Sequence, residues 1–319
     1  MQSFLDPAIL FFVFGMVAGL LKSNLEIPAP ISRFLSLYLL MALGLKGGFA
    51  LAKSGLTTEV AVSLGAALLL ATVVPLMGYM LLRRFLSGYD AAAIAATYGS
   101  VSAVTFITAV QYLDTHGIDY GGHMAAAMAL MESPAIILAV VLANWVRQRQ
   151  GAATTSPSMG KILHESVTDG AQLLLLGAML IGLLTGASGE AVMKPFSVDL
   201  FKGMLAFFLL DMGLLAARNL GSLKGKSAWL LAYALLAPLV HASMALGLGW
   251  MLGISSGNLA LLMVLAASAS YIAVPAVIRH AIPEANPSLY FSMSLGLTFP
   301  FNILIGIPLY VSVAQKLGA

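Results

Sequence analysis

Long apolar runs separated by short polar stretches make up most of this chain. A helix that crosses a bilayer needs about 17–25 mainly apolar residues. Ten stretches approach or reach that length once single polar positions are tolerated, so the pattern predicts an all-α polytopic membrane protein with ten transmembrane helices. The predicted spans cover residues 7–21, 31–51, 59–82, 90–113, 121–146, 169–186, 196–216, 227–252, 257–281 and 286–314. The first and sixth spans are short, which indicates oblique helices.

The composition agrees with this pattern and excludes a soluble globular protein. Of the 319 residues, 60% are hydrophobic and 9% are charged, whereas a soluble domain carries roughly a quarter charged residues. The chain has no cysteine, which excludes disulfides and thiolate metal sites. We expect no cofactor and no enzymatic activity, because the spans lack a neighbouring pair of carboxylates and the nucleophile motifs of hydrolases.

Lysine and arginine are unevenly divided between the two ends of the predicted spans. With ten spans both termini lie on one side. That side carries five of the sixteen basic residues, whereas the opposite side carries eleven. The five are Lys46, Lys53, Lys194, Lys202 and Lys316. Because basic residues favour the cytoplasmic side, we expect a multi-pass membrane protein with both termini outside. The bias points to the lipid bilayer as the partner and gives no reason to invoke nucleic acid.

Three pairs of short motifs recur at a nearly constant distance along the chain, which indicates an internal repeat. The two Ser-x-Ser motifs lie 168 positions apart (268 − 100), and the two other pairs lie 169 and 166 positions apart. The pairs are Ser100-Val101-Ser102 with Ser268-Ala269-Ser270, Gly44-Leu45 with Gly213-Leu214, and Pro134 with Pro300. Accidental similarity between helices rich in small residues is the alternative explanation.

The repeat divides the chain into two sets of five spans. Residues 1–147 form the first repeat and residues 169–319 the second. The polar stretch 147–166 has no hydrophobic periodicity, so residues 148–168 are predicted to be a cytoplasmic linker. Because five is odd, the second repeat must enter the membrane from the opposite face. Inverted repeats of this kind are a common transporter architecture.

The paired serine motifs lie near the middle of the fourth and ninth spans, where they predict broken helices. Serine and glycine are weak helix formers, and non-helical backbone at membrane depth occurs only where it lines a cavity or is buried in protein. Two half-helices that begin near the midplane would direct free N–H groups and positive dipole ends at one point. The motifs therefore predict a site for a small anion. Alternatively, the small residues only let the helices approach closely.

Two acidic residues lie inside the predicted spans, Glu132 in the fifth and Asp211 in the seventh. An ionisable residue in the membrane is a functional candidate because its burial is costly. Pro134 frees a carbonyl near Glu132, and oxygen ligands of this type suit sodium. Asp211 has no oxygen-rich neighbours in its span, so a structural role is favoured there.

The predicted sodium ligands are Glu132, Thr105, Thr298 and Asn302. Thr298 and Asn302 lie four positions apart, which places them on one helical face. Two other roles for Glu132 remain open: it can bind a proton instead of sodium, because burial favours the neutral form, or it can make a structural hydrogen bond between helices.

Several stretches of the chain resemble the cyanobacterial sodium-dependent bicarbonate transporters of the SbtA-like permease family. In the second half these are residues 267–276, 281–290, 297–302 and 306–310. In the first half, Gly99-Ser100-Val101-Ser102 and Glu132-Ser133-Pro134 match the family's Gly-Ala-Val-Ser and Asp-Ile-Pro. The resemblance extends over essentially all ten spans.

This resemblance implies sodium-coupled uptake of bicarbonate by an elevator-type homotrimer. The first, second, sixth and seventh spans would form the scaffold, and the other six would carry the solute. A PII-like cytoplasmic regulatory protein would be a further partner, and sodium would be the coupling ion. The implied bicarbonate-binding residues are Gly99, Ser100, Val101, Ser102, Ala103, Ser268, Ala269, Ser270 and Tyr271. The alternative function is a sodium- or proton-coupled carrier of another small organic or inorganic anion.

Overall fold

The computed structural model of the protein describes residues 6–149, 164, 168–221 and 227–317, and every regular element in these ranges is helical. Seven of the described stretches are long and apolar enough to cross a membrane, and two further apolar helices are shorter. The seven are Ala29–Ser54, Thr58–Leu82, Gly88–His116, Met124–Arg149, Gly170–Leu220, Ala228–Met251 and Pro287–Leu317. The prediction of an all-α polytopic membrane protein is therefore confirmed.

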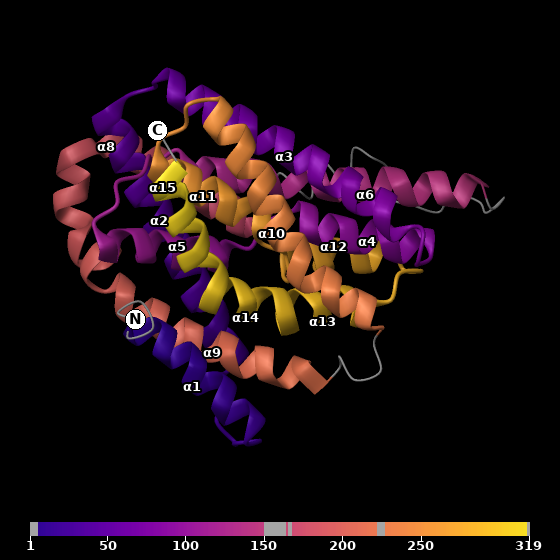
Figure 1. The fold of residues 1–319 in the computed structure, drawn as a ribbon. Coiled ribbons are helices and arrows are strands. Elements are labelled where there is room, and N and C mark those ends of the chain that lie inside the picture. The colour runs from indigo at the N-terminus through magenta and orange to yellow at the C-terminus, as the bar shows by residue number, and fades with distance from the viewer. Residues whose placement is uncertain (1–5, 150–163, 165–167, 222–226, 318–319) are drawn as a thin grey trace.

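The helices follow the predicted spans closely along the chain (Figure 1). The first half contains α1 (Pro7–Leu20), α2 (Ala29–Ser54), α3 (Thr58–Leu82), α4 (Gly88–Gly99), α5 (Ala103–His116) and α6 (Met124–Arg149). The second half begins with α8 (Gly170–Lys194), the π-helical turn η2 (Pro195–Asp199), α9 (Phe201–Leu220) and α10 (Ala228–Met251). It continues with α11 (Ser256–Ala267), α12 (Ala273–Ala281), α13 (Pro287–Met293), η4 (Ser294–Thr298), α14 (Phe299–Phe301), η5 (Asn302–Gly306) and α15 (Ile307–Leu317).

Both predicted helix interruptions are present. The backbone leaves the helical region after Gly99, with Ser100 at φ −95° and ψ −175°, and returns to it only at Ala103. The second interruption begins at Ser268, with φ −78° and ψ 162°, and ends where α12 begins. Every residue from 91 to 99 of α4 and from 257 to 267 of α11 is buried. Residues 100–102 and 268–271 are buried as well, while Ile272 is exposed, so nearly all of the non-helical backbone lies inside the protein, where it is tolerated.

Glycines join two pairs of helices at very short distances. Gly15 and Gly213 lie at the contact between α1 and α9, and Gly44, Gly48 and Gly182 lie at the contact between α2 and α8. A Cβ atom on Gly48 would lie 2.1 Å from a backbone oxygen of α8. Small residues at this spacing are typical of tightly packed membrane helices. Figure 1 shows α1 lying along α9 and α8 curving around one edge of the protein.

The other helices pack mainly among themselves. Helix α3 contacts α4 and α6, α10 contacts α11, and α11 contacts α15. Buried side chains of α3, α4, α6, α10, α12 and α13 form a continuous apolar cluster. The fully buried ring of Tyr98 lies within it, 5.2 Å from the ring of Tyr233 and nearly perpendicular to it.

Most predicted span ends lie within a few residues of the helix ends. The sixth span was expected to end at residue 186, and the regular helix does end there: Gly186 has φ 54° and ψ −140°, a conformation that favours glycine, and a further helical segment runs from this kink to Lys194. The fifth span was expected to end at residue 146, but α6 continues to Arg149. Arg147, expected at the start of a polar linker, is instead buried and donates two hydrogen bonds to Glu284. A local sequence pattern cannot reveal this distant partner. Most of the predicted linker 148–168 lies outside the described residues.

Candidate functional site

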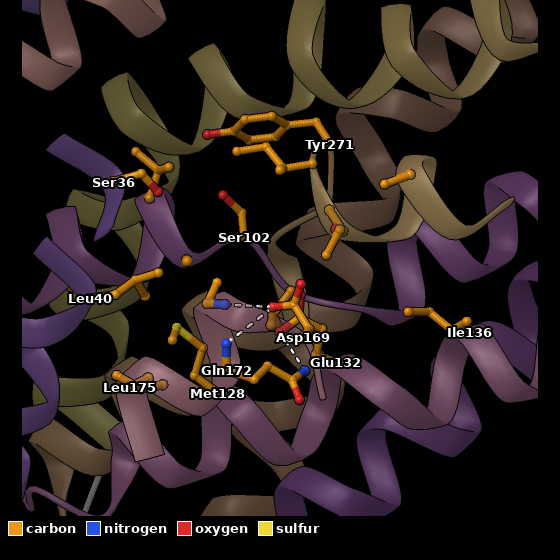
Figure 2. Close-up of a pocket in the computed structure, with 18 of the residues that line it drawn as sticks. Ser36, Leu40, Ser102, Met128, Glu132, Ile136, Asp169, Gln172, Leu175 and Tyr271 are labelled. Carbon is orange, nitrogen blue, oxygen red and sulfur yellow. Dashed lines mark hydrogen bonds between the residues drawn. The ribbon is translucent and has the colours of Figure 1, made fainter. Parts of the chain in front are cut away.

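A cavity of about 210 Å³ lies where the two interrupted helices meet α2, α6 and α8 (Figure 2). A water molecule needs roughly 10–15 Å³ of such space, so the cavity has room for a small ion together with several waters. The first interruption and the start of α5 contribute Val101, Ser102, Ala103 and Val104. The second interruption and the start of α12 contribute Ser270, Tyr271, Ile272 and Ala273. Among the residues that the structure describes, no lysine or arginine lines this cavity.

Helix α5 directs its N-terminus at the cavity. Ser102 caps this end: its Oγ accepts a hydrogen bond from the backbone N–H of Thr105 at 3.2 Å. Its carbonyl accepts the next one, from the N–H of Phe106 at 3.0 Å. Helix geometry leaves the N–H groups of Ala103 and Val104 without an intrahelical acceptor. Both residues line the cavity, which therefore receives two free donors and the positive end of a helix dipole.

Helix α12 also begins at this cavity. Ser270 Oγ accepts a hydrogen bond from the backbone N–H of Val274 at 3.2 Å. The N–H of Ala276 bonds to the carbonyl of Ile272 at 3.2 Å. Ala273, at the first position of the helix, lines the cavity. Two helix starts from distant parts of the sequence therefore face one small space, an arrangement suited to an anion.

Hydrogen bonds that cross between the two interruptions hold them together. The N–H of Ser102 donates to Ser268 Oγ at 2.9 Å, and Ser268 Oγ donates to the carbonyl of Leu265 at 2.9 Å. In the opposite direction, the N–H of Ser270 donates to the carbonyl of Thr97 at 2.8 Å. Each interruption thus satisfies backbone groups that the other leaves free, which fixes the relative position of the two helix starts.

The nine residues predicted to bind bicarbonate fall into two groups. Five line the cavity, namely Val101, Ser102, Ala103, Ser270 and Tyr271. The other four lie behind its wall. A Cβ atom on Gly99 would lie 2.5 Å from Pro75, and Ser100 Oγ is buried with no hydrogen-bond partner in the described part of the chain. Ser268 bridges the interruptions as described above, and Ala269 is buried in apolar packing.

An acidic group lies on the opposite wall of the cavity. Glu132 of α6 lines the cavity, and its Oε2 accepts a hydrogen bond from Gln172 Nε2 at 2.7 Å (Figure 2). Asp169 caps α8 by accepting from the N–H groups of Ala171 and Gln172 at 3.0 and 3.1 Å. Gln172 and Asp169 were not predicted as site residues. The sequence signal that could have drawn attention to them was an aspartate just before an apolar helix, which is typical of a helix cap, followed by a glutamine in the first turn of that helix.

The remaining sodium candidates lie elsewhere. The side chain of Thr105 bonds to Ser102 Oγ at 3.0 Å, just behind the cavity wall. Thr298 donates to the carbonyl of Ala234 at 2.7 Å and shares a 2.7 Å hydrogen bond with Tyr98. Asn302 donates to the carbonyl of Ala267 at 2.8 Å and accepts from Tyr310 at 3.1 Å, which fixes the end of α11. None of the three lines the cavity with Glu132.

Asp211 was expected to be structural. The residue is 5% exposed, and its Oδ2 has no hydrogen-bond partner within the described ranges. No group of three or more His, Asp or Glu side chains in those ranges is placed to hold a metal ion. A cation in the cavity would therefore rely on the carboxylates of Glu132 and Asp169, which both line it, together with hydroxyl and carbonyl oxygens and water.

The comparison with known proteins agrees with this geometry. The chain has no match among curated proteins. A family model described as the Na⁺-dependent bicarbonate transporter superfamily matches residues 7–315, which is nearly the entire sequence. The match includes both helix interruptions and every residue that lines the cavity. The chain therefore belongs to the Na⁺-dependent bicarbonate transporter superfamily.

Proposed function

We propose that this protein takes up bicarbonate together with sodium by alternating access. The observation that carries the proposal is the convergence of two helix N-termini on one cavity, whose lining in the described ranges includes no lysine or arginine. Free N–H groups and serine hydroxyls are donors that suit the oxygens of a small, singly charged anion. Fixed cationic side chains would hold such an anion tightly and slow its release.

The acidic wall supports coupling to a cation. Glu132 lines the same cavity as the two helix starts, so a sodium ion at its carboxylate would lie near the bound anion. Moving an isolated charge through the membrane interior is costly. Sodium and bicarbonate together carry no net charge, so each ion lowers the cost of moving the other. This mutual compensation is the physical basis that we propose for symport.

We also propose that the chain consists of two inverted five-helix repeats. The helix contacts support this symmetry. The first span (α1) packs on the seventh (α9), and the second span (α2) packs on the sixth (α8), so each of these two helices of the first repeat contacts the counterpart of its neighbour in the other repeat. Two hydrogen bonds follow the same symmetry, because each joins the start of one interrupted helix to a residue of the other half of the chain. Asp90 Oδ1, at the start of α4, accepts from the N–H of Asn286 at 2.8 Å. Asn258 Oδ1, at the start of α11, accepts from the N–H of Gly121 at 2.6 Å.

In this proposal both termini lie outside and the cavity opens to the cytoplasm. Four ion pairs support the predicted sidedness of the span ends relative to one another, since each joins two segments that the Lys and Arg distribution places on the same side. They are Asp6–Lys202, Lys46–Asp114, Lys53–Glu190 and Arg147–Glu284, with N–O distances of 3.1, 2.7, 2.7 and 2.6 Å. Ser36, Asp169 and Val277 line the cavity from span ends predicted to be cytoplasmic.

The glycine contacts support an elevator mechanism. Helices α1, α2, α8 and α9 pack in tight pairs and would form the scaffold, whereas α3–α6 and α10–α15 would carry the cavity. By resemblance to the SbtA-like permeases, we extend the proposal to a homotrimer in the bacterial inner membrane. A PII-like cytoplasmic protein as regulator is part of the same proposal.

Uptake of radiolabelled bicarbonate into proteoliposomes tests this function. An inward sodium gradient should drive accumulation, while an equal potassium gradient should not. Accumulation driven by a proton gradient without sodium would instead favour the proton-coupled alternative. Strong competition by small carboxylates would favour an organic anion as the substrate. Equilibration of bicarbonate without accumulation under any gradient would contradict the symport proposal.

A further inference from the structure

The hydrogen bond between Glu132 and Gln172 connects two separately packed sets of helices. Glu132 belongs to α6, which packs on α3 and α4. Gln172 belongs to α8, which is held against α2 by the contacts of Gly44, Gly48 and Gly182. Contacts between α6 and α8 themselves are few by comparison. This 2.7 Å bond is the polar link between α6 and α8, and the ion pair of Lys46 and Asp114 links α2 to α5 at another point of the same boundary.

We propose that Gln172 competes with the coupling cation for Glu132, and that cation binding releases α6 from α8. The inference rests on the proposed function, because it assumes that Glu132 is the cation-binding carboxylate. The pair Glu132 and Gln172 is called the latch below. In this account the latch keeps an empty carrier from moving and opens when sodium is bound.

The competition follows from the chemistry of the two groups. Sodium binds oxygen lone pairs, and the lone pair of Glu132 Oε2 that faces α8 is occupied by an N–H of Gln172. A cation at that oxygen would meet the positive end of the amide dipole. The amide must therefore turn away before the cation can take its place. Once it has turned, the latch no longer joins α6 to α8.

Gln172 is held in position for this role. Its backbone N–H donates to Asp169 at 3.1 Å in the first turn of α8, and 8% of the residue is exposed. Its side chain reaches across the cavity toward Glu132, as Figure 2 shows. The scaffold thereby supplies a neutral donor to a carboxylate of the moving part. An amide suits this role because it releases the carboxylate more easily than a lysine would.

The inference predicts a specific change in the sodium dependence. Gln172→Leu removes the donor but keeps most of the volume, so sodium no longer has to displace a hydrogen bond. A hydrogen bond to a charged group contributes enough that sodium should act at about a tenfold lower concentration in this variant. A merely structural defect would lower the maximal uptake rate and would not improve the apparent sodium affinity.

Cross-linking reports the latch directly, because the natural chain contains no cysteine. Met128 and Leu175 line the cavity from α6 and α8, close to the latch but outside it. Met128→Cys and Leu175→Cys, combined in one chain, should be bridged by mercuric ion when sodium is absent. Sodium should reduce the bridged fraction at least threefold, whereas potassium should not change it. In the Gln172→Leu background the same reduction should need less sodium.

Gln111→Leu is a matched control, because it is the same change in another helix. Gln111 donates from its amide to Thr115 at 3.0 Å in α5, away from this cavity. It should leave both the cross-link and its sodium dependence unchanged. The inference is overturned if sodium leaves the cross-link unchanged or increases it. It is also overturned if acidification releases the cross-link and sodium does not, or if Gln172→Leu raises the sodium requirement.

Parallel uptake measurements separate this inference from the proposed function. If sodium drives bicarbonate accumulation but does not affect the cross-link, only the latch is refuted. If sodium opens the cross-link but does not drive bicarbonate uptake, the latch stands and bicarbonate symport fails. The uptake of Gln172→Leu without added cysteines gives a second test that does not depend on correct folding of the cross-linking variant.

Discussion

Replacing Ser102 by alanine tests the role of the serine hydroxyl at the first helix start. Ser102 Oγ accepts hydrogen bonds from the backbone N–H and from the side chain of Thr105, at 3.2 and 3.0 Å. These two bonds occupy the acceptor capacity of the hydroxyl. Its own proton is thus the group's remaining hydrogen-bonding capacity, and the side chain lines the cavity beside Tyr271, whose side chain is within hydrogen-bonding reach of it (Figure 2).

The magnitude of the effect follows from the number of bonds lost. A hydrogen bond to a charged group contributes about 1.5–3 kcal/mol, which corresponds to roughly a 10- to 150-fold change in affinity. Loss of the helix cap costs about a further 1 kcal/mol of helix stability. Ser102→Ala should therefore raise the half-saturating bicarbonate concentration by roughly one to two orders of magnitude, while the protein remains folded.

The assay is initial-rate uptake of labelled bicarbonate by proteoliposomes at saturating sodium. Ser243→Ala is the control, because the exposed hydroxyl of Ser243 donates to the carbonyl of Leu239 within α10 at 2.8 Å. That variant should keep the half-saturating bicarbonate concentration of the natural protein. If Ser102→Ala is folded and its half-saturating bicarbonate concentration is within twofold of the natural value, the reasoning about the first helix start is refuted.

Three other variants test separate parts of the account. Glu132→Gln should abolish the stimulation of uptake by sodium, and unchanged stimulation would redirect the search for the cation to other oxygens. Gly48→Ala should lower the melting temperature in detergent, because its Cβ would lie 2.1 Å from a backbone oxygen of α8 and overpacking costs about 1–3 kcal/mol. Gly65→Ala in α3 is its control, since open space surrounds that position; equal melting temperatures would contradict the close contact. The hydrogen bonds from Arg147 hold the pKa of Glu284 below its usual range, so this pair stabilises the protein above the unfolded pKa of about 4.3 and the gain is lost as pH falls through the folded pKa. Glu284→Gln should flatten that acid loss in thermal unfolding, and a parallel pH profile would contradict it.

The helix interruptions could be predicted because their cause is local. Serine and glycine weaken a helix wherever they cluster, and the same pattern occurs at Ser100–Ser102 and Ser268–Ser270. The apolar spans themselves were predictable for the same reason, since hydropathy is read along the chain. The end of the sixth span at Gly186 was predicted correctly. The end of the fifth span was placed at residue 146, short of the end of α6 at Arg149, because hydropathy does not report the distant partner of Arg147.

The parts that escaped prediction depend on contacts between distant segments. Gln172 is an ordinary polar residue in its own helix, and only the packing of α8 brings it to Glu132. Ser268 was predicted to contact the anion, but it faces the backbone of Ser102. Asn302 was chosen for its oxygen, yet that oxygen accepts from Tyr310. In these cases the partner of each polar group is set by the three-dimensional packing, which a local sequence pattern does not report.

A structure of the protein with saturating sodium and bicarbonate tests the central claim most directly. The account predicts a planar anion in the cavity, within hydrogen-bonding distance of the N–H groups at the starts of α5 and α12. An anion bound elsewhere, with the N–H groups of Ala103 and Val104 still facing only water, would contradict it.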